Sequence, residues 1–160
     1  NNMNSELNLE LYTIAMTRLN NGFAKIGDII QDNTELINSS TDAEDFNKLA
    51  IKIKRTLPDF RKSSSEFEEF YNDIVNDLSQ DEINVNEYQP FFEHVDEVFP
   101  AYESQLNDGI AGLKESIGGV NPKIDNELAE LEELLNKTGE IFNKILKLAD
   151  EQMVIIKGGN

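Results

Sequence analysis

Few residues in the sequence could support metal or thiol chemistry. The chain has one histidine, His94, and no cysteine. A di-metal carboxylate bundle places a glutamate three residues before an inward-facing histidine, but Phe91 occupies that position here. His94 also falls between the apolar positions Phe92 and Val95, so we expect it to face water. Without cysteine, thiolate catalysis and cysteine-based zinc sites are excluded, and we expect no metal centre.

Nucleophilic, acid–base and nucleotide sites leave no recognisable pattern in the sequence. No Gly-x-Ser-x-Gly elbow is present, and one exposed histidine does not indicate a catalytic triad. The Gly118-Gly119 pair is followed by Val-Asn-Pro and therefore lacks the lysine of a phosphate-binding loop. The 31 acidic residues guarantee many chance carboxylate pairs, so spacing alone does not indicate a catalytic dyad. We expect a protein that is not an enzyme and that binds no cofactor.

Charge is the most informative functional signal in the chain. The 31 acidic residues exceed the 14 basic residues and give a net charge of −17. Six of the bases fall within positions 48–62, whereas 13 acids and no base lie between Lys62 and Lys114. This polarity disfavours nucleic acid and anionic membranes as direct partners, and it favours basic proteins. An acidic face that only promotes solubility is the simpler interpretation.

Two groups of residues are candidates for contact with a partner. The first consists of acids expected on the outer faces of the second and third helices, where a basic partner could dock: Glu66, Glu69, Asp73, Asp77, Glu93, Asp96, Glu97 and Glu103. The second is an apolar row that flanks the main seam of the last helix: Leu134, Ile141, Leu148 and Ile155. This row is either ordinary core or, if the last helix is not enclosed, the interface of a homodimer or another partner.

Apolar spacing predicts the fold. In the first segment Tyr12, Met16, Leu19 and Phe23 begin a heptad seam in which steps of four and three residues alternate. The same rhythm recurs in three later segments, which polar or glycine-containing stretches separate. We expect helices at about 5–38, 42–78, 87–117 and 122–157. Because the connections are short, we predict one all-α domain over residues 1–160, an elongated antiparallel up-down-up-down four-helix bundle.

Capping residues, prolines and glycines mark the expected breaks. Thr41 or Asp42 should cap the second helix. Pro58 should kink that helix, and the alternative is a separate helix that starts at the proline. Pro100 should bend the third helix. The stretch 118–122, Gly-Gly-Val-Asn-Pro, should end the third helix and start the fourth.

The predicted helix directions also place many aromatic residues together. They fall at the end of the bundle that holds the 79–86 connection: Tyr12, Phe67, Tyr71, Tyr88, Phe91 and Phe92. Such a cluster either fills a wider section of the core or lines a ligand pocket.

Three functional hypotheses follow from these observations. The first is a non-enzymatic interaction domain that docks a basic protein. The second is a ligand-sensing input domain of a membrane receptor, since the length and architecture are similar in broad outline to the helical-bundle sensory domains of chemoreceptors, without a shared motif. The third is an acidic inhibitor that imitates nucleic acid, but duplex DNA carries about one charge per 1.7 Å, a density that 13 acids on two helices do not approach. No segment is apolar enough to enter a membrane, and the absence of a visible signal peptide favours the cytoplasm.

Overall fold

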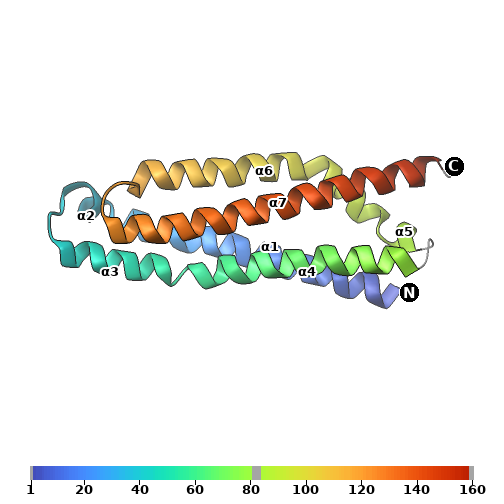
Figure 1. Cartoon of the computed structure of the whole chain (residues 1–160), viewed down its shortest axis with the longest axis horizontal. Coiled ribbons are helices and arrows are strands. Elements are labelled where there is room, and N and C mark those ends of the chain that lie inside the picture. Colours follow the sequence, from blue (N-terminus) through green and yellow to red (C-terminus); the bar gives the residue numbers. More distant parts are fainter. Residues whose placement is uncertain (1, 81–83, 159–160) are drawn as a thin grey trace.

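Helices make up nearly all of the described chain. A computed structural model describes residues 2–80 and 84–158, and within them there are seven helices and no strand, so the predicted all-α class is confirmed. The helices are α1 (Asn2–Asp32), α2 (Thr34–Ser39), α3 (Ala43–Lys54), α4 (Leu57–Gln80), α5 (Asn84–Glu87), α6 (Gln89–Ile117) and α7 (Pro122–Gly158). Figure 1 shows four rods along the long axis of an elongated molecule, formed by α1, by α3 with α4, by α6 and by α7. None of the described helices combines the length and the apolar character that crossing a membrane requires.

The first expected helix is interrupted at Asn33, the one polar residue in its seam. The side-chain amide of Asn33 donates to the carbonyl of Ile29 at 2.7 Å. The backbone N–H of Asn33 is shared between the carbonyls of Ile29 and Ile30, at 3.2 and 3.3 Å. An asparagine that bonds its own preceding turn competes with regular helix formation, and α1 ends one residue earlier, at Asp32.

The second expected helix is two helices, so the prediction of one kinked helix over 42–78 is wrong and the two-helix alternative is correct. Pro58 has no N–H to donate to the carbonyl of Lys54, and its ring would collide with that carbonyl. The helix α3 ends at Lys54, and α4 begins at Leu57. The hydroxyl of Thr56 donates to the carbonyl of Ile53 at 2.7 Å in the intervening turn. By contrast, α6 continues through Pro100, and a kink there stays a prediction.

The breaks expected at Asp42 and at 118–122 coincide with helix ends of the structure, whereas α6 begins at Gln89 and not at 87. The side chain of Asp42 caps α3 by accepting a hydrogen bond from the N–H of Glu44 at 2.9 Å. The helix α6 ends at Ile117, and α7 starts at Pro122. Between them Gly119 has a φ of 77°, a left-handed conformation that glycine adopts without steric cost. The turn between α6 and α7 is therefore short and well defined.

The rods pack around the molecule in the order α1, α4, α7 and α6. The rod α1 packs on α4, α7 packs on both α3 and α4, and α6 packs on α7. Within the described residues the backbone of α6 rarely comes close to that of α4 or α1, and α6 meets them through side chains, as at Phe70–Phe91 and Tyr12–Phe91. The chain passes from α4 to α6 through α5, which touches α1, α4, α6 and α7. Consequently α4 and α7, which run in the same direction (Figure 1), are neighbours, whereas the expected arrangement made only antiparallel rods neighbours.

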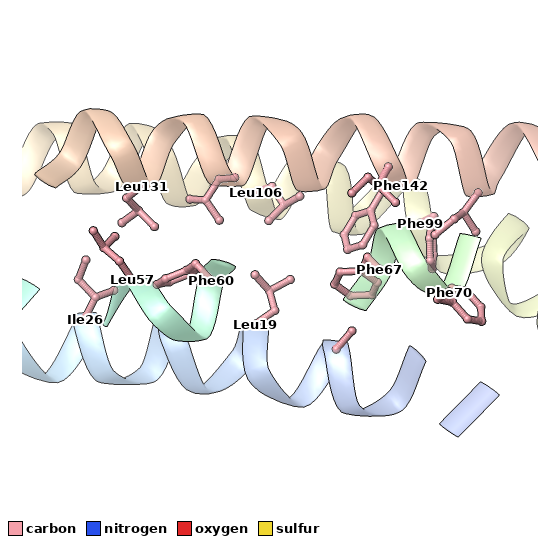
Figure 2. Close-up of a cluster of buried hydrophobic side chains, with 14 of the residues drawn as sticks. Leu19, Ile26, Leu57, Phe60, Phe67, Phe70, Phe99, Leu106, Leu131 and Phe142 are labelled. Atoms are coloured by element: carbon pink, nitrogen blue, oxygen red, sulfur yellow. The ribbon is translucent and has the colours of Figure 1, made fainter. Parts of the chain in front are cut away.

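Aromatic rings join the rods in the core. The ring centroid of Phe142 in α7 lies 4.9 Å from that of Phe67 in α4 and 5.0 Å from that of Phe99 in α6. The ring of Tyr12 in α1 lies 6.0 Å from Phe67 and 5.1 Å from Phe91. Figure 2 shows the rings of Phe67, Phe99 and Phe142 grouped between the rods. Each such pair adds about 0.5–1.5 kcal/mol to the effect of burial, so this section holds the rods together.

Two glycines of α1 provide a matched test of this packing. A Cβ on Gly22 would lie 2.7 Å from the ring of Phe60, which is itself only 1% exposed, whereas a Cβ on Gly27 would meet nothing within 4 Å. We expect Gly22→Ala to destabilise the protein by about 1–3 kcal/mol through overpacking. Gly27→Ala should stabilise it by about 0.5–1 kcal/mol through helix propensity. Urea unfolding followed by circular dichroism measures both, and equal effects of the two changes would contradict the packing described here.

Candidate functional site

The most unusual electrostatic feature is a pair of carboxyl groups from α6 and α7. The side chain of Asp150 is hydrogen-bonded to that of Asp96, and this bond, with partial burial and the charge of Asp96, raises the pKa of Asp150 above its ordinary value of 3.8. Both side chains are exposed, and two ionised carboxylates that approach each other repel, which favours the protonated form of one of them. The pair therefore marks a place where negative charge is crowded.

Further acids and amides lie along the same two helices, α6 and α7. Glu103 and Glu140 line one groove of about 320 Å³ between α6 and α7, together with Asn107, Asn136 and Asn143. Glu93 and Glu97 are exposed on α6 beside Asp96. We call the following residues the α6–α7 acidic face: Glu93, Asp96, Glu97, Glu103, Glu140 and Asp150. Within the described part of the chain, none of them forms an ion pair with a basic residue.

Sequence reasoning missed two members of this face, Glu140 and Asp150. The signal that could have found them is the short turn between Ile117 and Pro122, because a short turn fixes which residues of two antiparallel helices face each other. The ion pair between Lys114 and Glu132, 2.6 Å long, lies close to this turn and follows the same register.

The acids of α4 belong to a different surface. Glu66 forms an ion pair with Arg18 of α1 at 2.7 Å. Glu69 is exposed and Asp73 is half-buried. Because α4 packs mainly on α1 and α7 and meets α6 through buried rings such as Phe70 and Phe91, the structure does not join these acids to those of α6. The acidic surface expected over the second and third helices is thus divided into two parts.

Asp77 lies in the interior instead of on the surface, which corrects its assignment to the docking face. Its side chain is 6% exposed, and the hydroxyl of Tyr88, which is fully buried, donates to its carboxylate at 2.7 Å. The side-chain amide of Asn8 in α1 donates to the same hydroxyl oxygen at 2.8 Å. Burial and the bond to Asp77 raise the pKa of Tyr88, so its hydroxyl keeps its proton. These three side chains tie α1, α4 and the start of α6 together at the end that holds α5.

The apolar row of α7 is mostly core, which is one of the two interpretations that the sequence left open. Ile141 is 4% exposed, and Leu134 and Leu148 pack against the hydrophobic core. Only Ile155, near the end of α7, is strongly exposed, at 57%. The reason is that α7 packs on α3 and α4 as well as on α6, so it buries a wider stripe than a single seam.

Neither the single histidine nor similarity to other proteins indicates a function. His94 is exposed, as expected. The described residues contain no group of three or more histidine or acidic side chains that could hold a metal ion. No protein-family model, curated protein or solved structure matches this chain. The surfaces and cavities of the molecule itself are therefore the guide to its function.

Removing one hydroxyl tests the role of the buried network. Tyr88→Phe should destabilise the protein by about 1–3 kcal/mol, because it takes a donor from a buried carboxylate. The control is Tyr71→Phe, whose half-buried ring lies 5.9 Å from the ammonium of Lys144 and which should change stability by less than about 0.5 kcal/mol. Urea unfolding measures both free energies, and equal values would contradict the structural role of the network.

The carboxyl pair predicts a pH-dependent gain from neutralisation. The folded-state pKa of Asp150 is raised. Its contribution to the free energy of unfolding is therefore favourable below the unfolded pKa, and it is lost as pH rises through the folded pKa. Asp150→Asn should therefore stabilise the protein by about 0.3–0.5 kcal/mol at pH 7 and have almost no effect near about pH 3.5. The control is Asp108→Asn, which removes the charge of another exposed aspartate, on α6. A gain that does not depend on pH would overturn this prediction.

Proposed function

We propose that this chain is a non-enzymatic helical interaction domain that docks a basic partner through the α6–α7 acidic face. The observation that carries the proposal is the carboxyl pair of Asp96 and Asp150, where negative charge is crowded without a basic partner among the described residues. A cation placed beside both carboxylates would relieve their repulsion, and complementary fields would accelerate association.

The distribution of ion pairs supports the choice of this face over the α4 surface. Glu66 is already paired with Arg18, and Glu68 with Lys137 at 3.3 Å. A partner that docked there would have to compete with these intramolecular pairs. A partner that docked on the α6–α7 acidic face would not have to displace an intramolecular ion pair. The asparagine side chains of the groove between α6 and α7 offer additional hydrogen-bond donors and acceptors.

We also propose that the long helices form an elongated four-helix bundle, which would suit such docking. Four long rods provide rigid outer faces about 50 Å long at 1.5 Å per residue, which suits recognition of an extended or helical partner. The same architecture agrees with the alternative of a ligand-sensing input domain. An acidic imitation of nucleic acid is less well supported, since the acids of α4 and α6 lie on separate surfaces.

A basic peptide tests the docking face directly. A fluorescent lysine-rich peptide is titrated with the protein and followed by anisotropy at low and at high salt. We expect the triple change Glu93→Gln, Glu97→Gln and Glu140→Gln to weaken binding at least about fivefold, or roughly 1 kcal/mol.

The control for this experiment removes the same charge elsewhere. Glu6, Glu10 and Glu35 are exposed on α1 and α2, and their change to glutamine should alter the affinity by less than about twofold if binding is local. Equal losses in the two triple variants would show attraction to net charge alone and would overturn the proposal. Absence of binding to the unmodified protein at low salt would do the same.

A further inference from the structure

A second surface of the molecule is hollow between α1 and α6. The rods α1 and α6 run in the same direction (Figure 1), and they touch where Tyr12 meets Phe91 and Phe99. A cavity of about 490 Å³ opens between them. Its lining consists of Met16, Leu19, Asn20, Phe23, Tyr102, Gln105, Leu106, Gly109 and Phe142. The cavity is separate from the α6–α7 acidic face and shares no residue with it.

The base of the cavity is apolar and firmly packed. Leu19 and Phe142 are 4% and 1% exposed, and Leu106 is 5% exposed. Figure 2 shows these three side chains converging from three different rods. An apolar body placed on this base would lose water contact without displacing any polar partner, which favours binding by about 25 cal/mol per Å² of buried apolar area.

The walls are held in position before any ligand arrives. Phe23 packs edge-to-face on Phe60, with 5.3 Å between ring centroids. Tyr102 contacts Phe99 at 5.5 Å and Phe142 at 6.4 Å. Gly109 leaves room for Phe23, since a Cβ there would lie 3.0 Å from the ring. A preformed site avoids the entropy cost of ordering side chains on binding.

The polar groups at the mouth define the ligand further. Asn20 and Gln105 are exposed, and each carboxamide can both donate and accept hydrogen bonds. No charged side chain lines the cavity, so a charged ligand would give up hydration without gaining a partner. The other cavities differ in this respect, because acids line the α6–α7 groove and two lysines line a smaller one beside α3.

We propose that the α1–α6 cavity binds a small neutral molecule with an aromatic or aliphatic body and one polar group that bonds to Asn20 or Gln105. The volume falls within the range of about 300–1,000 Å³ typical of small-molecule sites. A docked helix needs apolar anchors over several turns. The strongly exposed large hydrophobic side chains of the described chain, however, lie outside this cavity, at Leu7, Ile14, Ile51, Val75, Val154 and Ile155.

Two dyes that share one ring system test the charge and size requirements. N-phenyl-1-naphthylamine is neutral, and 8-anilinonaphthalene-1-sulfonate carries a sulfonate on the same skeleton. Both are titrated at about 0.5 M salt, which screens the net charge of the protein. We expect saturable one-to-one binding of the neutral dye, with at least about tenfold weaker binding of the sulfonate. Equal affinities, or no saturable binding of the neutral dye, would overturn the proposal.

A variant pair places the binding site within the fold. Met16→Trp should fill the cavity and weaken binding of the neutral dye at least about tenfold. Ile14→Trp, on the same helix but outside the cavity, should leave the affinity within about twofold. Thermal unfolding verifies that both variants are folded.

Methionine methyl NMR locates the dye without any substitution. In the unmodified protein, the methyl signal of Met16 should shift as the neutral dye is added. The signal of Met153, which packs against the core near the end of α7, should stay in place. A shift of Met153 with an unchanged Met16 would place the dye elsewhere and would contradict the proposal, even if Met16→Trp did not fold.

Discussion

The packing of three rods converges on the ring of Phe142. Phe67 from α4 and both Phe99 and Tyr102 from α6 lie against it, so this one side chain of α7 links α4 to α6, which also meet directly at Phe70 and Phe91. The rod α1 reaches the same aromatic section through Tyr12. Beside this section, the rings of Phe23, Tyr102 and Phe142 line the cavity between α1 and α6 without filling it.

The placement of charge follows from the same arrangement. With 31 acids and 14 bases, most acids have no basic partner to bind. Most of the described ion pairs between rods involve α4: Arg18 bonds Glu66, Lys25 bonds Asp59, Arg61 bonds Glu130, and Lys137 bonds Glu68, whereas Lys114 bonds Glu132 between α6 and α7. The outer side of α6 and α7 receives little of this compensation. Surface ion pairs are individually weak, at about 0–1 kcal/mol, but their distribution determines where negative charge stays concentrated.

The sequence predicts the local features of this fold well and the order of the rods poorly. Heptad seams identify the helices, and Asp42, Gly119 and Pro122 mark their ends, because capping and turn formation depend on a few adjacent residues. A seam shows which face of a helix is buried, but it does not show which helix covers that face. The neighbours of α7 could therefore not be read from its spacing, and the apolar row through Ile141 was open to two interpretations.

The candidate sites show the same limit. Asp77 resembles a surface acid in sequence, but in the structure its buried carboxylate accepts a hydrogen bond from Tyr88, which lies beyond α5. The pairing of Asp96 with Asp150 and the gap between α1 and α6 both arise from contacts between distant segments. Such contacts depend on the arrangement of the rods, which spacing within one helix does not determine.

The carboxyl pair of Asp96 and Asp150 also couples occupation of the α6–α7 acidic face to proton exchange. A cationic group that settles beside both carboxylates stabilises their ionised forms and lowers the raised pKa of Asp150, so Asp150 gives up its proton more readily as the cation arrives. At any pH at which the pair holds that proton, the buffer must take it up. The heat of association then contains the ionisation enthalpy of the buffer, and the number of protons released per complex reports whether a ligand has settled at this one place.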